Sequence, residues 1–516
     1  MDTKKENLAE KYQQKTDIEH ILDAPDTYIG LVEEDETRGY TSIESKDNTM
    51  ELSNKVFNWV PGLYKLFDEG IVNCRDHAIR LGELTKKKKK NIIPVKNIEI
   101  TVDKETGIIT MMNDGNGIDI EKHPENDIWI PEMIFGHLRT STNYKKDEKK
   151  TVGGKNGFGF KLVLIYSEWG EIETVDHIRK KIYTQRFLNN LDTIQQPKIR
   201  KSSVKPYTLV RFKPDYKRFG LKGLTDDMYN LFRKRTYDIA AVTGQDVKVK
   251  FNGYHLNIKG FENYIDSFIG KKCETKRLYE NPNVRWEYAV CVSPFDEFRQ
   301  VSYVNGISTG KGGKHVDYIL NQILKKMGVY IEKKKKIKVR SASIKEQLML
   351  FINCVIENPS FDSQTKDYMN IPISKFGSKC NVSDGLIDKL AKMGVMEAAL
   401  SSTQLKEISG AKKTDGRKTR SIRGIPKLID ANWAGGSKSN QCILILCEGD
   451  SAKAGIVSGL SREDRNNYGV FPLKGKLLNT KDANIKKIND NNEISCIKKI
   501  MGLEANKKYT KEEIKK

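Results

Sequence analysis

The chain has 516 residues, too many for one compact core, and this length predicts about three domains. Hydrophobic residues make up 38% of the sequence and aromatic residues 9%, which excludes a disordered chain. The 90 Lys and Arg residues outnumber the 68 Asp and Glu residues and give a net charge of +22. A polyanion such as nucleic acid is therefore a natural partner, although a charge-rich solvated surface would have the same composition.

The cysteines and the N-terminus bear on the cellular compartment. The eight cysteines are scattered, with no CxxC spacing and no nearby histidine that would suggest a zinc site. Residues 1–15 lack the apolar segment of a signal peptide, and no stretch approaches the ~18 apolar residues that a membrane span needs. The sequence predicts a soluble protein of the cytosol or nucleus with reduced thiols.

The first expected elements are a polar arm and a helix. Residues 1–55 are polar and contain the turn-like sequence APDTYIG (Ala24–Gly30). From Pro61 onward apolar residues recur at spacings of three and four, which predicts an amphipathic helix. Its apolar stripe is formed by Leu63, Phe67, Ile71, Cys74 and Ala78. A lysine-rich loop is expected at Lys86–Lys90, and alternating sequences from Val95 onward predict strands.

Two further blocks of strands and helices are expected before a linker. Residues 205–254 contain the strand-like sequences YTLVRF and VKVKFNG, and residues 261–400 contain WEYAVCV and VSYVNGI. Helices are expected in VDYILNQILKKM (316–327) and in IKEQLMLFINCVI (344–356). The polar and basic sequence GAKKTDGRKTRSIRG is typical of a linker. The apolar run CILILC (442–447) then predicts a strand, directly before the acidic turn EGDSA.

Two polar residues of the predicted first helix are candidates for catalysis. Glu69 and Asn73 are four residues apart, so a helix places them on the same face. A carboxylate there can take a proton from an attacking water, and an amide oxygen one turn away can bind Mg²⁺. A solvated helix flank is the simpler interpretation, and the pair alone does not exclude it.

Two glycine-bearing segments follow. In NDGNG (Asn113–Gly117), small residues let the backbone approach a flat ring, and an Asn or Asp can accept the exocyclic N–H of adenine. The segment is equally compatible with a hairpin turn. GGKNGFGFK (Gly153–Lys161) leads into an apolar helix and offers backbone N–H groups to phosphates, although a lone glycine-rich loop is a weak signal.

In this order and at these intervals, the three signals resemble the nucleotide-binding boxes of the GHKL ATPases, the superfamily of gyrase, a heat-shock chaperone, a mismatch-repair clamp and histidine kinases. Further motifs are similar to those of eukaryotic-type DNA topoisomerase II, a type IIA topoisomerase, over nearly all of residues 11–505. These motifs are VPGLYKLFDE, IFGHLRTSTNY, GKGGKHVDY, ENPSFDSQTK, KFGS, RGIPKLIDAN, EGDSA and YGVFPLKGKLLN.

The resemblance implies an α+β fold, with a GHKL (Bergerat) ATPase sandwich, a ribosomal-S5-like transducer domain and a partial TOPRIM α/β domain. It implies a homodimeric clamp that binds and hydrolyses ATP with Mg²⁺ and acts on double-stranded DNA in the nucleus. The implied boundaries are an N-terminal arm at 1–55, the ATPase domain at 56–258, the transducer at 259–403, a basic linker at 404–439 and the partial TOPRIM domain at 440–516.

The resemblance also assigns roles in the ATPase domain. Glu69 would be the general base, Asn73 the ligand of the Mg²⁺ that accompanies ATP, and Asn113 the contact to adenine. The residues expected at the ribose and the phosphates are Ser141, Thr142, Asn143, Gly154, Lys155, Asn156, Gly157, Phe158, Gly159, Phe160 and Lys161.

Further nucleotide contacts are implied from outside the ATPase domain. Gln364 and Lys366, with Thr365 between them, would reach the γ-phosphate from the transducer and have a catalytic role. A cation on a separate domain can distinguish ATP from ADP and convert hydrolysis into domain motion. Tyr12 matches the arm tyrosine that crosses to the nucleotide of the partner subunit, although it could equally be an ordinary surface aromatic.

The sequence departs from the family pattern at two positions of the predicted helix. Gly70 stands where the family usually has a branched apolar residue, which should cost the helix roughly 1 kcal/mol. His77 stands where an Asn is common, close to the expected metal ligand.

Two segments are expected to act on DNA. Glu448, directly after the apolar run, resembles the TOPRIM glutamate that takes part in Mg²⁺ chemistry at the scissile phosphate; an acidic helix N-cap is the structural alternative. The sequence EKKKKIKVR matches a lysine-bearing loop that faces DNA in the family, and a solvated charge run is the bland alternative. Its proposed DNA contacts are Lys333, Lys334, Lys335, Lys336, Lys338 and Arg340.

The downstream acidic pair, winged-helix domain and cleavage tyrosine of the family are not in this sequence, so we expect ATPase activity only. Two rival functions are a GHKL clamp that never cuts DNA, such as a chaperone or repair scaffold, and a purely structural DNA-binding module. EGDSA and PLKGK argue against the first, and the hydrolytic set Glu69, Asn73 and Lys366 argues against the second.

Overall fold

The computed structural model describes residues 12, 14–43, 51–140, 151, 159–295, 297–413, 425, 427–475, 477–481, 483, 485–504, 507–510 and 513. The chain divides into two compact units. The larger unit comprises Met1–Lys336 and Ile344–Val395, and the smaller unit comprises Ile337–Ser343 and Met396–Lys516.

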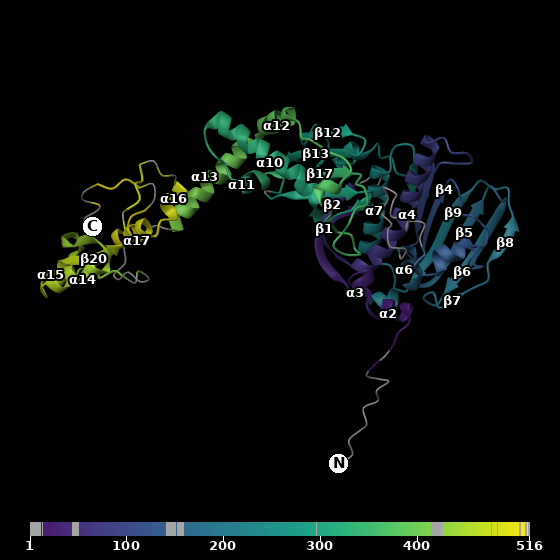
Figure 1. Cartoon of the computed structure of the whole chain (residues 1–516), viewed down its shortest axis with the longest axis horizontal. Helices are drawn as coiled ribbons and strands as arrows, with labels where there is room; N and C mark the ends of the chain where they lie inside the picture. The colour runs from purple at the N-terminus through teal and green to yellow at the C-terminus, as the bar shows by residue number, and fades with distance from the viewer. Residues whose placement is uncertain are drawn as a thin grey trace, which may run out of the picture. The chain divides into compact units, whose positions relative to one another are not determined.

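A mixed sheet is the centre of the first half of the larger unit (Figure 1). Strand β10 pairs parallel with β3, and the other strand pairs are antiparallel. In spatial order the strands are β11 (Tyr254–His255), β10 (Lys248–Phe251), β3 (Asn97–Val102), β4 (Ile109–Asp114), β9 (Tyr207–Pro214), β5 (Ser167–Asp176), β6 (Lys181–Leu188) and β7 (Thr193–Ile194), with β8 (Lys198–Lys201) also paired to β6.

Helix α4 (Pro61–Lys86) is the central helix over this sheet and packs against β4, α6 (Gly159–Ile165) and α7 (Asp226–Val242). It begins with proline at its first turn, where the missing N–H is not needed. The five residues of its predicted apolar stripe are all buried, so the predicted helix and its buried face are confirmed. The short helix α5 (Ile130–Gly136) packs on α6.

The N-terminal segment contains regular structure that composition alone did not predict. Helices α2 (Asp17–Asp23) and α3 (Pro25–Tyr28) precede a hairpin of β1 (Asp35–Ile43) and β2 (Glu51–Trp59). The hairpin crosses the arm boundary expected at residue 55. It packs on α7, and this burial stabilises strands whose own sequence is polar.

A second mixed sheet follows in the larger unit, with helix α10 (Lys314–Lys335) packed on it. Its strands, in spatial order, are β12 (Arg277–Asn283), β13 (Trp286–Val292), β17 (Leu348–Cys354), β14 (Arg299–Val304) and β15 (Ile307–Ser308). Smaller elements around it are α8 (Phe261–Tyr264), α9 (Asp266–Ile269), β16 (Gly312–Gly313), α11 (Ser341–Lys345), β18 (Tyr368–Met369) and α12 (Asp384–Leu390).

The helix expected over residues 344–356 is wrong. Helix α11 ends at Lys345, and β17 then runs between β13 and β14. Six of the seven β17 residues are buried, because sheet and helices cover both faces of a central strand. A strand buried on both faces has no alternating pattern, and its periodicity cannot be told from that of a buried helix.

Two other expected segments differ from the structure. Lys333, Lys334 and Lys335 form the last turn of α10 rather than a loop, and Lys336 ends the helix with a left-handed backbone at φ 57°. Cations are favourable at a helix C-terminus, so the lysine run extends this helix. Helix α13 (Met396–Lys413) includes the first ten residues of the expected linker, since a polar composition does not exclude a helix.

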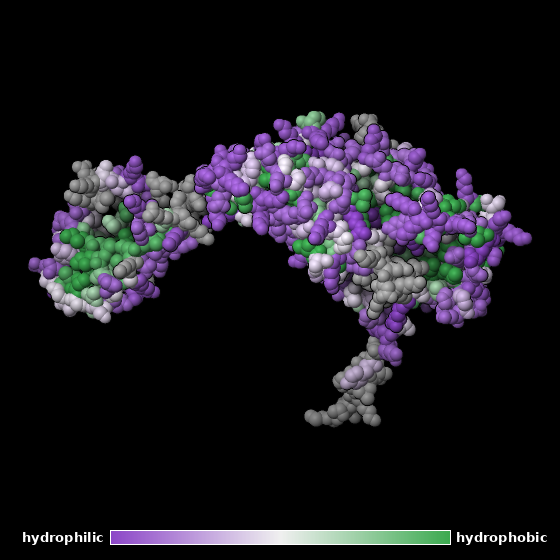
Figure 2. All heavy atoms as spheres, turned by 45° about the horizontal axis from the view of Figure 1, so that its top comes forward, coloured by the Kyte–Doolittle hydropathy of each residue, from purple (hydrophilic) through white to green (hydrophobic). Residues whose placement is uncertain are grey.

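The smaller unit contains a parallel pair of strands, β19 (Ile443–Glu448) and β20 (Tyr468–Leu473), joined through α14 (Gly449–Gly459) and α15 (Asp464–Asn467). Helices α16 (Ile485–Asn489) and α17 (Asn492–Met501) follow. Hydrophobic residues gather on the face of this unit that Figure 2 presents. Ile443 and Leu446 of β19 are 52% and 40% exposed, so this strand is only partly covered by the described residues.

Two expectations from composition can be compared with the structure. All eight cysteines are free thiols. Within the described part of the chain, no helix has the length and apolar character of a membrane span.

Candidate nucleotide site

A cavity of about 970 Å³ lies between α4, β4, α6 and the loop at 359–366. In the sequence this loop follows β17, the central strand of the second sheet. Helix α4, the first sheet and this distant loop thus meet at one place, as the predicted site requires. Of the predicted residues, those that line the cavity are Glu69, Asn73, Asn113, Gly159, Phe160, Lys161, Gln364 and Lys366.

Glu69 and Asn73 are one helical turn apart on α4, and both line the cavity. Glu69 is 5% exposed, whereas Asn73 is exposed. Gly70, between them, lies so close to the sheet that an added Cβ would overlap the Met111 sulfur and lie 3.4 Å from the Phe160 ring. A side chain at Gly70 would require the Met111 thioether to move, so the space beside Met111 favours a glycine at this departure from the family pattern.

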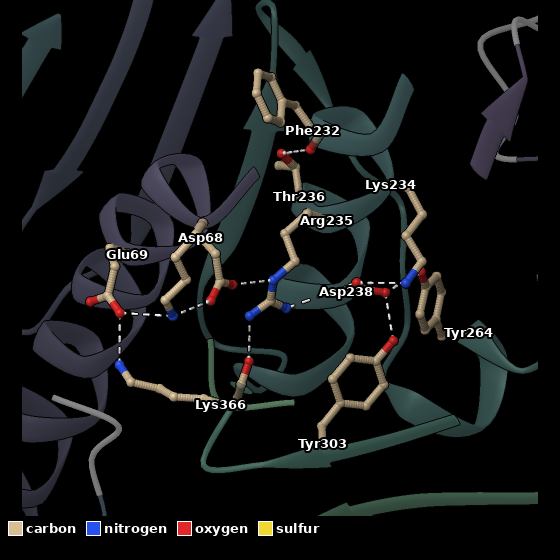
Figure 3. Close-up of polar contacts among 12 residues, drawn as sticks. Asp68, Glu69, Phe232, Lys234, Arg235, Thr236, Asp238, Tyr264, Tyr303 and Lys366 are labelled. Atoms are coloured by element: carbon tan, nitrogen blue, oxygen red, sulfur yellow. Dashed lines mark hydrogen bonds and ion pairs between the residues drawn. The ribbon is translucent and has the colours of Figure 1, made fainter. Parts of the chain in front are cut away.

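Two lysines hold the Glu69 carboxylate. Lys366 Nζ donates to Glu69 Oε1 at 2.7 Å, and Lys65 Nζ lies 2.8 Å from the same oxygen (Figure 3). Burial alone would raise the pKa of Glu69, but the charges of Lys366 and Lys65 overcome that effect and lower it to about 2. Glu69 is therefore an ionised carboxylate within a buried ion cluster.

Asn113 and Asp114 at the end of β4 have different surroundings. Asp114 accepts hydrogen bonds from the backbone N–H groups of Lys96 (2.6 Å) and Asn97 (2.8 Å), so it fixes the neighbouring backbone. Asn113 is buried and lines the cavity, with Nδ2 donating to the Asp114 carbonyl at 3.0 Å. That donation leaves the Asn113 amide oxygen as an acceptor for a ligand amine.

Three residues of the predicted phosphate segment are described, all at the start of α6. An added Cβ at Gly159 would come within 2.5 Å of Glu69 Oε2, so the backbone there passes directly beside the carboxylate. Lys161 Nζ donates to the Thr140 carbonyl at 2.7 Å, and burial lowers the pKa of this lysine to about 8. Phe160 packs on Phe135. The other predicted phosphate and ribose contacts, Ser141–Asn143 and Gly154–Phe158, lie outside the described residues.

The loop from the second sheet places its three predicted residues differently. Gln364 and Lys366 line the cavity, and Lys366 has a left-handed backbone with φ 62°. The Thr365 methyl group instead lies 3.1 Å from the position of an added Cβ at Gly30, in the arm. Thr365 therefore packs against the arm, and its hydroxyl pairs with Ser363 at 2.7 Å.

His77 also lines the cavity, one helical turn beyond Asn73 on α4. One ring nitrogen lies 2.7 Å from the Asn116 carbonyl, and the other lies 2.7 Å from an Arg80 guanidinium nitrogen. Burial, together with the charge of Arg80, lowers the pKa of His77 to about 4. His77 is therefore neutral near pH 7 and supports the turn that carries Asn116.

Sequence reasoning missed a buried ion cluster behind Glu69 (Figure 3). Arg235 of α7 is completely buried; its Nε donates to Asp68 Oδ1 at 2.6 Å, and Nη2 donates to the Gly306 carbonyl at 2.7 Å. Asp238 Oδ1 accepts from the hydroxyls of Tyr264 and Tyr303, both at 2.6 Å. Charged residues at buried positions of α4 were the available signal, because Lys65, Asp68 and Glu69 follow helical spacing.

This cluster joins α4 and α7 to the second sheet. Arg75 of α4 adds a hydrogen bond from Nη1 to the Asn305 carbonyl at 2.8 Å. An apolar cluster that includes Tyr303 combines Tyr237 and Val242 of α7 with Phe351 of the second sheet. The nucleotide cavity is thus tied to the second sheet by buried polar and apolar contacts.

The remaining predicted sites lie apart from the cavity lining. Tyr12 is 74% exposed. Lys333–Lys336, Lys338 and Arg340 are all exposed. Glu448 is exposed at the N-cap of α14 and makes no side-chain capping bond, so the capping alternative is not supported. The described residues contain no group of three or more His, Cys, Asp or Glu side chains arranged to hold a metal.

Comparison with known proteins agrees with this architecture. The family model described as "Histidine kinase-, DNA gyrase B-, and HSP90-like ATPase" matches residues 60–215, and the model "DNA gyrase B" matches residues 254–417. A crystal structure of the ATPase region of Saccharomyces cerevisiae topoisomerase II has 40% sequence identity and a TM-score of 0.70, and the match covers 77% of this chain and 100% of that one. The chain belongs to the DNA topoisomerase II family.

The α+β fold predicted from sequence, a GHKL ATPase followed by a transducer domain, is confirmed. The ATPase and transducer domains of topoisomerase II from Balamuthia mandrillaris also match, with 36% identity, a TM-score of 0.70, 77% of this chain and 98% of that one. DNA topoisomerase 2 of Pisum sativum is 43% identical over 98% of this chain. The chain spans 34% of the length of that relative and 39% of the length of the Acanthamoeba polyphaga mimivirus relative.

Proposed function

We propose that this chain is the ATP-binding and ATP-hydrolysing dimer clamp of a type IIA DNA topoisomerase, which passes one duplex through a transient double-strand break in another. The observation that carries the proposal is the 2.7 Å contact between Glu69 and Lys366 at the cavity. A carboxylate base from the ATPase fold there meets a cation from the transducer fold. Hydrolysis at this point can therefore be coupled to movement of the transducer.

Each cavity residue has a chemical role in this proposal. Glu69 takes a proton from the attacking water, and Asn113 accepts the exocyclic N–H of adenine. Gln364 and Lys366 contact the γ-phosphate, for which Lys366 has to exchange its Glu69 partner for a phosphate oxygen. The Glu69 carboxylate and the γ-phosphate then compete for the Lys366 ammonium, so the partner of Lys366 depends on whether a γ-phosphate is present.

Magnesium fits the residues at the cavity. Asn73 presents an amide oxygen at the exposed end of the α4 face that also carries Glu69. Mg²⁺ is a hard cation that prefers oxygen ligands, and phosphate oxygens and water would complete its shell. When bound, the ion would neutralise phosphate charge. Asn73 is the residue that we expect to hold it.

We propose a homodimer that closes when ATP binds. The arm that contains Tyr12 would cross to the nucleotide of the partner subunit, and the high exposure of Tyr12 in the single chain fits that role. Deletion of residues 1–20 should weaken dimerisation, measured by sedimentation with a non-hydrolysable ATP analogue. A dimer that is unchanged after this deletion would rule out arm exchange.

The proposal includes contacts with DNA, a nuclear location and five segments in the predicted order; the hairpin β1–β2 crosses the boundary predicted at residue 55, and α13 crosses the one predicted at residue 403. The basic residues Lys333–Lys336, Lys338 and Arg340 are exposed, and they carry enough charge to neutralise phosphates. The parallel unit β19–α14–β20 would begin the TOPRIM domain, with Glu448 at the carboxyl end of its first strand as a Mg²⁺ ligand. The two family matches, over 60–215 and 254–417, support separate ATPase and transducer domains.

An ATPase assay with and without duplex DNA tests the proposal. We expect Mg²⁺-dependent hydrolysis that DNA stimulates. Hydrolysis without any DNA response would favour the rival function, a GHKL clamp that does not act on DNA. DNA binding without hydrolysis would favour a structural module, and the proposal would then fail at its first step.

A further inference from the structure

We infer that Lys65 is a positioning residue for ATP hydrolysis, which holds the Glu69 carboxylate in its working orientation after Lys366 has moved to the nucleotide. This inference rests on the proposed function. Lys65 lies one turn before Glu69 on α4 and is 3% exposed. Its Nζ lies 2.8 Å from Glu69 Oε1 and 3.4 Å from Asp68 Oδ2.

The burial of Lys65 needs an explanation, because stability alone does not favour it. A buried ammonium loses its hydration, and a well-packed apolar side chain at such a site is often as stable or more stable. Burial acts to lower the pKa of Lys65, but the charges of Glu69 and Asp68 raise it above its usual value. Lys65 is thus held as a cation by the two carboxylates, one of which is the proposed base.

The two oxygens of Glu69 face different groups. Oε1 contacts both Lys65 and Lys366, whereas Oε2 lies beside Gly159, at the end of the glycine-rich segment. The oxygen beside the phosphate segment is the one that can meet the attacking water. A cation on Oε1 therefore fixes the side-chain rotamer that presents Oε2 to the reacting atoms.

The two lysines differ in what they can reach. Lys366 belongs to the loop from the second sheet, and it is part of the cavity lining formed by the described residues, whereas Lys65 is not. Lys366 can thus turn to a phosphate, whereas Lys65 is a buried residue of α4 and stays beside Glu69. Among the residues that the structure describes, Lys65 is the cation that still holds Glu69 Oε1 once Lys366 has moved.

Lys65 also connects the base to the buried cluster. Asp68 lies between Lys65 and Arg235, and Arg235 donates to Gly306 next to the second sheet (Figure 3). Because Arg235 and Asp238 are completely buried, these groups have little freedom to rearrange. Lys65 is thus anchored on one side while it holds Glu69 on the other, which makes the orientation of the carboxylate rigid.

The test compares Lys65→Met, which removes the charge at similar volume, with Lys65→Arg, which keeps it. We expect Lys65→Met to lower kcat by about 100-fold, as a misplaced catalytic group does, with KM for ATP and analogue affinity within twofold. Lys65→Arg should recover most of kcat, since it restores a cation at Oε1. Equal losses in the two variants, or a normal kcat in Lys65→Met, would overturn the inference.

Two further measurements keep the result interpretable. Thermal unfolding and binding of an ATP analogue separate positioning from a structural role. If the thermal midpoint and the analogue affinity fall together with kcat, Lys65 only supports the fold. If Lys65→Met is not recovered folded, Lys65→Gln replaces it, and the same gap in kcat to Lys65→Arg is required. Glu69→Gln is measured alongside. An active Glu69→Gln variant refutes the role of Glu69 as the base. An inactive Glu69→Gln variant together with a normal kcat in Lys65→Met refutes only the role of Lys65.

Discussion

In the larger unit the carboxylate with a predicted catalytic role, Glu69, is 5% exposed and contacts two lysines, whereas Glu448 in the smaller unit is exposed at the end of a strand. Glu69 was predicted from its helical spacing to Asn73 together with a family resemblance, and Glu448 from the acidic turn EGDSA with the same resemblance. The structure surrounds only the first with partners from several elements. A buried, paired charge depends on each partner, while an exposed one does not, so substitutions in the two units should differ in effect.

The largest expected effect is the loss of hydrolysis in Glu69→Gln. The amide keeps the shape of the side chain but cannot accept a proton, so turnover should fall by about 100-fold or more while ATP analogue binding is retained. Single-turnover hydrolysis and equilibrium binding measure the two quantities. Glu83→Gln, on an exposed position of the same helix, is the matched control. Turnover above a few per cent of the original rate would place the base elsewhere.

The second effect concerns the stability of the buried cluster. Arg235→Met removes the completely buried cation that Asp68 and Asp238 share, and each carboxylate then keeps one lysine, Lys65 or Lys234. Removing one partner of a buried ion pair costs about 3–5 kcal/mol, and urea unfolding of the larger unit should show a loss of that size. Lys427→Met breaks an exposed pair with Asp450 in the smaller unit and should cause no measurable change. Similar results for the two variants would contradict the comparison.

The third effect is a pH dependence confined to the larger unit. His315 is completely buried, and burial lowers its pKa to about 3, well below its ordinary value. Below pH 6.5 the unfolded chain therefore binds a proton that the folded chain does not, so stability falls as the pH drops towards 3. The slope from this group is at most about 1.4 kcal/mol per pH unit.

Urea midpoints at several pH values check this dependence. His315→Gln should reduce the slope, because glutamine does not titrate, while His77, whose pKa is also lowered, continues to contribute. His255→Gln, at an exposed position of β11, should leave the slope as it is. An unchanged slope in His315→Gln would show that other buried groups control the acid response.

How far the sequence predicted the molecule depends on the kind of contact. The face of α4 was predictable, since its buried residues repeat along one helix and the pattern is local. The meeting of Glu69 with Lys366, 297 positions later, came only from resemblance to a family, because no local pattern encodes so distant a contact. The strand at 348–354 was mistaken for a helix, because burial on both faces removes the alternation.

The cluster around Arg235 was not predicted at all. Its members come from α4, α7, α8 and the second sheet, and apart from the helical spacing of the charged residues on α4 no local pattern links them. Gly70 shows the same limit in another way. The low helix propensity of glycine predicted only a loss of helix stability at this position. The Met111 sulfur, which an added Cβ would overlap, favours a glycine there.

The fourth effect is on DNA stimulation. Replacing Lys333–Lys336 with alanine should reduce DNA stimulation of ATPase activity, with hydrolysis in the absence of DNA nearly unchanged. Each lost phosphate contact should lower the slope of log affinity against log salt by about 0.9. A matched control is alanine replacement of Lys87–Lys90, an exposed lysine run in the same unit. If DNA stimulation of the ATPase and the salt slope of DNA affinity are both unchanged when Lys333–Lys336 are replaced, this lysine run is only a solvated surface.

The smallest effect is expected for Glu448→Gln. Glu448 occupies the N-cap position of α14 without a capping hydrogen bond, and the described residues around it contain no acidic cluster for a metal. Loss of a working cap would cost about 0.5–2 kcal/mol, so an unchanged thermal midpoint of the smaller unit distinguishes an exposed carboxylate from a cap. ATPase activity should also be unchanged, because this glutamate belongs to a separate compact unit. A clear fall in the thermal midpoint or in ATPase activity would mean that Glu448 already has a partner in this chain. The difference between the paired Glu69 and the exposed Glu448 would then be only one of degree.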